Sequence, residues 1–196
     1  MSATQRIEFD IITLFPKAFQ SYFNASILRR AQEKKFLSIA FRNPRDFAAG
    51  KHHKVDDTPY GGGAGMVLMA EPILRVVDKL ISSQFISQRK RKPRNLQTYK
   101  LKTKIAILSA KGKQFNQKIA QDWVKKYRRI ILVAGRYEGI DERVRLALKA
   151  EEISLGPYVL TDGDVAAMAV ISAVARLIPG VIKTASLTEE SHWNLL

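Results

Sequence analysis

The stretch IILVAGRYEGIDER, from Ile130 to Arg143, joins a short apolar run to a charged segment bounded by glycines. The run Ile130–Val133 is typical of a strand that is buried on both faces of a parallel sheet. It stops at Ala134-Gly135, and Asp141 then has a side chain suited to cap a helix. Ligands bind where such a strand ends in a glycine loop that leads into a helix, because backbone N–H groups and helix N-termini converge there. The stretch therefore predicts a ligand site directly after this strand.

Other parts of the chain also place glycine, small or acidic residues beside apolar runs. They are Val55–Met66, Ile105–Lys113 and Ile153–Ala167. One such loop alone is usually only a turn. Their recurrence in one short chain indicates that several loops close on a single ligand.

Apolar periodicity predicts a succession of strands and helices along the chain. Besides the run at Ile130, strands are expected at Ile7–Leu14, Leu37–Arg42, Ile105–Leu108, Glu151–Leu155 and Tyr158–Leu160. Helices are expected within Phe19–Lys35 and at Glu71–Ser82, Asn116–Lys126 and Val165–Leu177, with one more after Asp141 and with Asp162 as a cap for the last. This alternation predicts an α/β fold with a mostly parallel sheet flanked by helices.

Charge and cysteine content limit the function. The 196 residues fit one domain, and their formal net charge of +15 favours a polyanionic partner. Part of this charge lies in Ser83–Lys104, which carries eight Lys and Arg residues and no acid, and which we expect to be an exposed or disordered insertion that contacts RNA phosphates non-specifically. The absence of cysteine excludes disulfides, thiolate zinc sites and cysteine nucleophiles, and three histidines are too few for a histidine metal site. We expect no protein-bound structural metal.

Targeting and assembly signals are few. The apolar run Ile7–Phe15 lacks the basic lead of a signal peptide, and Val165–Ala175 has about half of the roughly 20 residues that cross a bilayer. A cytoplasmic protein without a membrane partner is expected. The helix at Val165–Leu177 has almost no polar residue before Arg176, so it must be buried on most sides. We interpret that as a subunit interface and predict a homodimer.

Five motifs resemble the bacterial tRNA (guanine-N1)-methyltransferases, in matching order over nearly the whole chain. They are NPRDF (Asn43–Phe47), VDDTPYGGGAGM (Val55–Met66), GRYEGIDERV (Gly135–Val144), EEISLGPYVLTDGD (Glu151–Asp164) and ARLIPGV (Ala175–Val181). Enzymes of that family use S-adenosylmethionine to methylate the guanosine just 3′ of the anticodon. The resemblance implies tRNA as the partner, with no DNA.

The resemblance also implies a SPOUT-type fold, a mostly parallel sheet whose C-terminal part forms a deep trefoil knot, working as a homodimer. The methyltransferase domain would be residues 1–182, followed by a tail of the interdomain type at 183–196. Carried onto matching positions, the knot loops would hold S-adenosylmethionine through Leu108, Ser109, Gly135, Tyr137, Glu138, Leu155, Gly156, Pro157, Tyr158, Val159, Leu160 and Gly163. A magnesium requirement cannot be read from these residues.

Methyl transfer to guanine N1 requires a base for the N1 proton, and a cation near O6 would stabilise the developing negative charge. The family's arginine matches Arg176, whose alternative role is to bind the last carbonyls of its own helix. The family's aspartate base matches Glu190, with Glu189 as the neighbouring candidate, and the longer glutamate changes the reach of the carboxylate. Further departures are Pro157 and Asp162, where the family commonly has Asp and Gly, and Ala110-Lys111, where it has Pro-Gln.

The chain ends at Leu196, whereas the family continues with a helical C-terminal domain that grips the tRNA. We expect that domain to be absent, by nature or because the chain is shortened. Two alternatives to the active enzyme therefore stay open. One is a catalytically silent homologue that binds RNA or cofactor, and the other is a methyltransferase for a different RNA.

Overall fold

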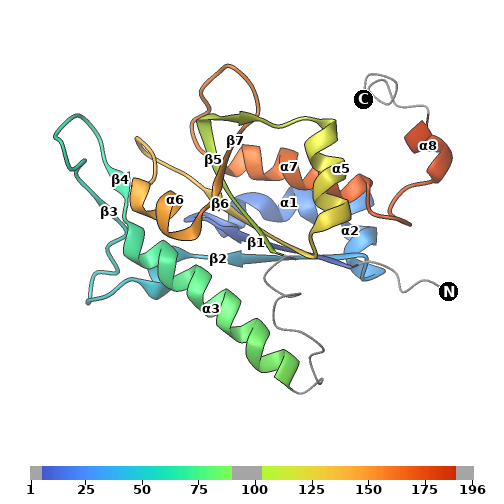
Figure 1. Cartoon of the computed structure of the whole chain (residues 1–196), viewed down its shortest axis with the longest axis horizontal. Coiled ribbons are helices and arrows are strands. Elements are labelled where there is room, and N and C mark those ends of the chain that lie inside the picture. The colour runs from blue at the N-terminus through green and yellow to red at the C-terminus, as the bar shows by residue number, and fades with distance from the viewer. Residues whose placement is uncertain (1–5, 90–102, 189–196) are drawn as a thin grey trace.

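The computed structural model describes residues 6–89 and 103–188 and contains a five-stranded sheet in the order β2-β1-β6-β5-β7. Every pairing in this sheet is parallel. Its strands are β1 (Ile7–Ile12), β2 (Leu37–Arg42), β5 (Thr103–Gln114), β6 (Arg129–Ala134) and β7 (Glu151–Ser154) (Figure 1). The α/β class and the parallel sheet are therefore as predicted.

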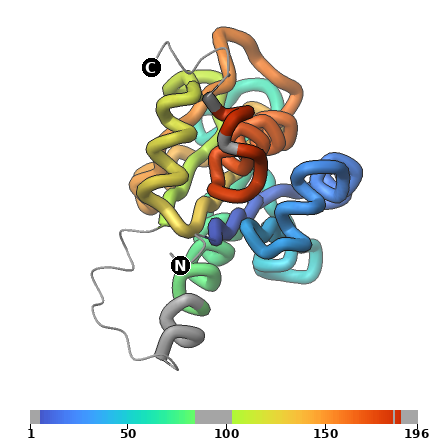
Figure 2. Tube along the Cα trace, turned by 90° about the vertical axis from the view of Figure 1, so that its right-hand side faces the viewer, coloured from blue at the N-terminus to red at the C-terminus, as the bar shows by residue number. Residues whose placement is uncertain are grey.

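The central strand β6 explains how the two faces of the sheet are covered. Its side chains alternate between two cores, Ile130 and Leu132 in one and Ile131 and Val133 in the other. The first core includes α2 (Ser26–Glu33), α5 (Gln117–Lys126) and α7 (Asp164–Arg176), together with the short elements η1 (Pro16–Phe19) and α1 (Gln20–Phe23). The second includes α3 (Ala70–Arg89) and α6 (Glu142–Leu148). Figure 2 shows α3 on the opposite side of β1 from α5 and α7.

Strand β5 differs from its prediction, which ended it at Leu108. It continues to Gln114, and its pairing with β7 shifts register between Leu108 and Lys113. The residues predicted as a loop thus form a bulge inside a strand. Gly112 permits this, because a Cβ there would lie 2.5 Å from the backbone of Glu152 and Ile153.

Two other predicted boundaries are also wrong. Tyr158–Leu160 is not a strand but part of the loop between β7 and α7, where the Tyr158 N–H donates to the Gly156 carbonyl. Helix α3 continues past Ser82 to Arg89, the last residue described in this part of the chain, since no proline or glycine lies between these positions. The basic segment Ser83–Lys104 therefore begins as helix and ends in β5, and residues 90–102 lie outside the described residues.

The long segment before α3 contains a 3₁₀ helix, η2 (Pro44–Phe47), and a small antiparallel hairpin of β3 (Asp56–Asp57) and β4 (Val67–Leu68). The loop between β3 and β4 projects from the body of the molecule at the end where α6 lies (Figure 1). After α7, a short helix α8 (Thr184–Thr188) is the last described element. Within the described residues no helix has the length and apolar character that a membrane crossing requires.

Candidate functional site

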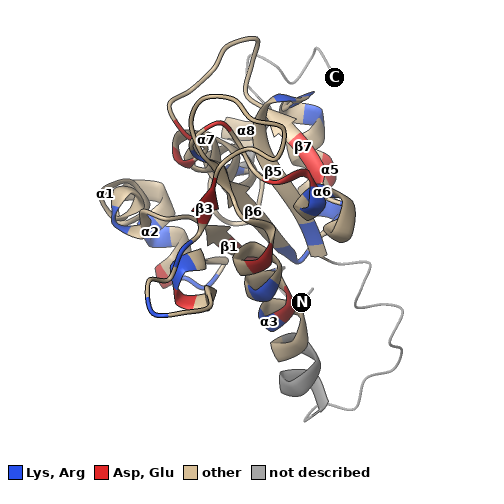
Figure 3. Ribbon diagram, turned by 90° about the vertical axis from the view of Figure 1, so that its left-hand side faces the viewer, with Lys and Arg blue, Asp and Glu red and all other residues tan. Residues whose placement is uncertain are grey.

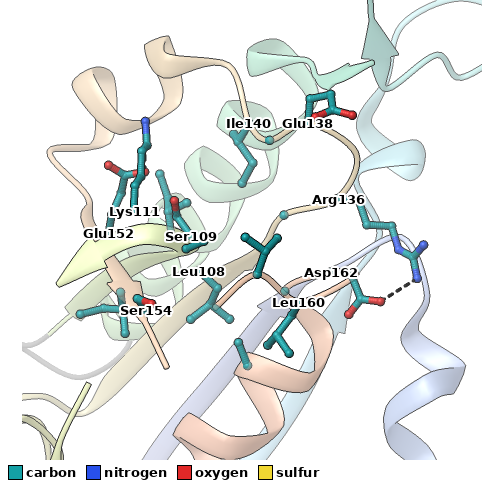
Figure 4. Close-up of a pocket in the computed structure, with 18 of the residues that line it drawn as sticks. Leu108, Ser109, Lys111, Arg136, Glu138, Ile140, Glu152, Ser154, Leu160 and Asp162 are labelled. Carbon is teal, nitrogen blue, oxygen red and sulfur yellow. Dashed lines mark hydrogen bonds and ion pairs between the residues drawn. The ribbon is translucent and has the colours of Figure 1, made fainter. Parts of the chain in front are cut away.

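A cavity of about 400 Å³ lies at the ends of β6 and β7 and at the bulge within β5. Its walls come from β5 at Ile107–Lys111, from the segment 135–142 after β6, and from residues 152–155 and 158–163 of β7 and the loop after it. Figure 4 shows Leu108, Ile140 and Leu160 with the polar side chains around them. This is the carboxyl edge of a parallel sheet, where α/β folds place ligands. The cavity therefore occupies the position predicted from the stretch after Ile130.

Most of the predicted cofactor residues line this cavity. They are Leu108, Ser109, Gly135, Tyr137, Glu138, Leu155, Tyr158, Val159, Leu160 and Gly163. Gly156 and Pro157 are not among its lining residues. Gly156 instead shapes the loop, because its N–H donates to the Ser154 hydroxyl and a Cβ there would lie 2.5 Å from the Tyr158 ring.

The segment after β6 is held by backbone contacts to the hairpin. The Glu138 N–H donates to the Met66 carbonyl at 3.0 Å, and Leu68 forms a bridge with Ile140. Tyr137 has a φ of 59°, which is uncommon for a bulky residue. Burial and a hydrogen bond to the Asp56 carboxylate both raise the pKa of the Tyr137 phenol, burial being the larger cause. The hairpin and the cavity wall therefore form one continuous structure.

Gly163 allows two backbone segments to meet behind the cavity. Its N–H donates to the Gly135 carbonyl at 2.8 Å. A Cβ at Gly163 would lie 2.7 Å from the Gly135 nitrogen and 2.9 Å from the Ala134 Cα. The loop after β7 thus lies directly against the end of β6.

An ion pair between Arg136 and Asp162, at 3.1 Å, ties the same two segments together (Figure 4). The Arg136 guanidinium also lies 4.1 Å from the centre of the Phe15 ring and 4.0 Å from Asp164. Asp162 accepts the Asp164 N–H at 2.8 Å, but α7 begins at Asp164 with Gly163 as its N-cap, so the predicted cap was wrong by one residue. The ion pair was not predicted, because no local pattern relates positions 26 residues apart.

We expect Arg136→Met to lower the free energy of unfolding by about 2 kcal/mol. This is less than the roughly 3–5 kcal/mol typical of breaking a buried ion pair, because the Arg136 side chain is one-third exposed. The change leaves Asp162 and the buried Asp164 without a cation. Urea denaturation at neutral pH measures it. Arg143→Met is a control. The Arg143 side chain is 73% exposed, so its ion pair with Asp141 should contribute little to stability. Equal losses in the two variants would contradict the prediction.

Asp164 gives a pH-dependent prediction. Burial raises the pKa of this carboxyl, although the Thr13 hydroxyl donates to it at 2.7 Å. The folded state therefore holds the proton more tightly than the unfolded state, and stability falls as pH rises from 3.8 through the raised folded pKa. Asp164→Asn removes that decline and keeps an acceptor for Thr13. We expect the difference in unfolding free energy, variant minus wild type, to increase between pH 4 and pH 7. The increase should be on the order of 1 kcal/mol for each unit by which the folded pKa is raised. A constant difference would contradict this.

A charged cluster at the rim of the cavity was also missed. Lys111 lies 3.6 Å from Glu152 and 3.9 Å from Glu142, and Arg145 is paired with Glu142. Figure 4 shows the side chains of Lys111 and Glu152 beside each other. The only sequence signal for this cluster was that Lys111 stands where the resembling family usually has Gln.

Of the two predicted catalytic residues, the structure describes only Arg176. Arg176 is the last residue of α7, is exposed, and is not among the residues that line the cavity. Glu190 and its neighbour Glu189 lie outside the described residues. Among the described residues, no group of three His, Cys, Asp or Glu side chains is placed to hold a metal ion.

Nearly the whole chain is similar to proteins of one known family. A family model described as tRNA (Guanine-1)-methyltransferase TrmD matches residues 7–196. A tRNA (guanine-N(1)-)-methyltransferase of Thermomicrobium roseum is 46% identical over 186 residues, which are 95% of this chain and 63% of that protein. The corresponding protein of Desulforamulus reducens is 47% identical, over 94% of this chain and 67% of its own length. The chain thus spans about two thirds of these relatives.

Among solved structures, the crystal structure of tRNA (m1G37) methyltransferase from Aquifex aeolicus is similar with a TM-score of 0.71. It is 34% identical, and the match covers 91% of this chain and 72% of that one. The fold seen here is therefore that of a solved methyltransferase. Together with the family model and the curated relatives, it shows that the chain belongs to the tRNA (guanine-1)-methyltransferase TrmD family.

Proposed function

We propose that this chain transfers a methyl group from S-adenosylmethionine to N1 of the guanosine that follows the anticodon in tRNA. The observation that carries the proposal is the cavity at the bulge of β5 and the ends of β6 and β7, because most residues that the family resemblance assigns to the cofactor meet there. The activity of the relatives and of the Aquifex aeolicus enzyme supports the same reaction.

The residues present fit S-adenosylmethionine. The cavity volume of about 400 Å³ lies in the range of small-molecule sites. Leu108, Ile140 and Leu160 offer an apolar surface for an adenine ring, and the Glu138 carboxylate complements a positively charged cofactor. When bound, the cofactor supplies an electrophilic methyl group on a sulfonium, so transfer requires no covalent protein intermediate.

The protein's part in the chemistry is to take a proton and to stabilise charge. Guanine N1 carries a proton that must leave as the methyl arrives. We assign the role of base to Glu190 and the stabilisation of the negative charge at O6 to Arg176. Because Arg176 is at the exposed end of α7, the assignment requires the target base to approach that end of the helix.

We also propose a homodimer, supported by exposed apolar side chains at the cavity rim. Helix α7 buries six of its apolar residues in its own chain, in the core it shares with α5, so its apolar character does not by itself require a partner. Exposed apolar side chains instead gather at the cavity rim, in Tyr158, Val159, Leu160 and Val165. A second subunit would cover them. The deep knot likewise remains a proposal, with the contact of Gly163 against Ala134 and Gly135 as its support.

The test is an assay of the protein with methyl-labelled S-adenosylmethionine and an unmodified tRNA transcript. Label at N1 of the guanosine 3′ of the anticodon supports the proposal, and a transcript with adenosine at that position should take up none. Binding of cofactor and tRNA without transfer would instead indicate a silent homologue. Label at another nucleotide would indicate a different RNA methyltransferase.

A further inference from the structure

The loop between β3 and β4 carries an aromatic ring that nothing in the described residues covers. The Tyr60 side chain is fully exposed, more than any other large apolar or aromatic residue of the described chain. A turn closed by the Gly62 N–H on the Pro59 carbonyl, at 3.0 Å, holds Tyr60 at its tip. Gly62 and Gly63 follow with φ of 79° and 123°, a backbone conformation that side chains rarely adopt. The loop thus presents a flat ring beside a backbone without side chains.

The base of this loop is fixed to the cavity. Gly65 packs so closely on the Glu138 side chain that a Cβ there would lie 2.5 Å from Glu138 Cγ. Three backbone hydrogen bonds of 3.0 Å join Met66 and Leu68 to the segment 138–141, which lines the cavity. Tyr60 is therefore held on a short arm that starts at the cavity wall and projects outward (Figure 1).

Positive charge lies near the ring. The Arg143 guanidinium, on the first turn of α6, is paired with Asp141 and also has a weaker electrostatic interaction with Tyr60. The segment before β3, where Figure 3 marks basic residues, adds the exposed Lys51 and Lys54, of which Lys54 is paired with Asp57 at 2.9 Å. An exposed aromatic ring with cations around it is the arrangement that binds an unpaired nucleobase and its phosphates.

We propose that Tyr60 stacks on an unpaired base of the substrate RNA next to the nucleotide that enters the cavity. The inference rests on the proposed function for the identity of the RNA, and it adds a binding site separate from the cofactor cavity. Stacking on Tyr60 holds the neighbouring nucleobase aside. Because the loop is anchored to the cavity wall, it sets the distance from that nucleobase to the wall. The target nucleotide is thereby positioned by its neighbour.

The test measures the affinity of an unmodified tRNA transcript in the presence of S-adenosylhomocysteine, so that binding is separated from transfer. We expect Tyr60→Ala to weaken tRNA binding about tenfold, within the range for loss of one stacked base, and Tyr60→Phe to keep it within about twofold. Thr58→Ala is the matched control in the same loop and should bind as the wild type does. Cofactor affinity, measured by calorimetry without RNA, should be equal in all four proteins.

Transcripts that lack a single base next to the target nucleotide identify the stacked partner. For one of these abasic positions, the loss of affinity seen with the wild type should vanish in Tyr60→Ala, since both changes remove the same contact. Wild-type affinity in Tyr60→Ala, or losses that simply add at every position, would overturn the inference. Methyl transfer by the wild type is scored separately, so the site and the proposed reaction can fail independently. A wild-type protein that bound no tRNA would overturn both.

Discussion

Gly163→Ala is expected to abolish cofactor binding and to lower the free energy of unfolding by about 3 kcal/mol or more, at the upper end of the cost of overpacking. The added Cβ would lie 2.7 Å from the Gly135 nitrogen and 2.9 Å from the Ala134 Cα. Both atoms belong to the backbone at the end of β6, which is buried, so neither can rotate away. The loop after β7 must then separate from β6, and the cavity between them loses its shape.

Two measurements check this result. Urea denaturation gives the change in stability, and calorimetric titration with S-adenosylmethionine gives the affinity. Gly61→Ala is the matched control, because nothing lies within 4 Å of its Cβ position and its φ is not in the left-handed region. We expect that variant to stay within about 0.5 kcal/mol of the wild type. A Gly163→Ala protein that bound cofactor normally would show that the close approach of the two segments is unnecessary.

The sheet could be predicted from the sequence because its central strand β6 is buried on both faces. The run from Ile130 to Val133 is continuous, since alternate side chains enter different cores, and both cores are apolar. The same reasoning located the cavity, because a glycine follows this strand at the carboxyl edge of the sheet. Local pattern thus sufficed wherever burial alone decided the structure.

Local pattern failed where distant segments determine each other's conformation. Strand β5 continues past Ser109 because β7 pairs with it again after the bulge, and the partner of Gly112 lies on that other strand. The pairing of Arg136 with Asp162 also depends on how the loop after β7 returns to β6. Conversely, Tyr158–Leu160 has the apolar character of a strand but lies exposed at the rim of the cavity. These features follow from the connections between strands, which periodicity does not encode.

The proposed base gives the second large effect. We expect Glu190→Gln to lower the rate of methyl transfer about 100- to 10,000-fold, the usual contribution of a positioned general base. The amide has nearly the size of the carboxylate but cannot accept the N1 proton at neutral pH. Single-turnover assays with labelled S-adenosylmethionine and saturating tRNA measure the chemical step free from product release.

Glu189→Gln is the matched control, because it removes the same charge from the adjacent position of the tail. If Glu190 is the base, only its own variant loses the rate, and both variants keep the wild-type affinity for cofactor and tRNA. Glu190→Asp distinguishes a base from a merely acidic side chain, since it restores the family's usual residue and should retain a substantial rate. Full activity in Glu190→Gln together with a large loss in Glu189→Gln would transfer the role to Glu189. Full activity in both variants would exclude Glu189 and Glu190 from proton removal. The base would then be sought among the carboxylates that line the cavity. Glu138 would be tested first, because it belongs to the segment after β6 that also carries proposed cofactor residues.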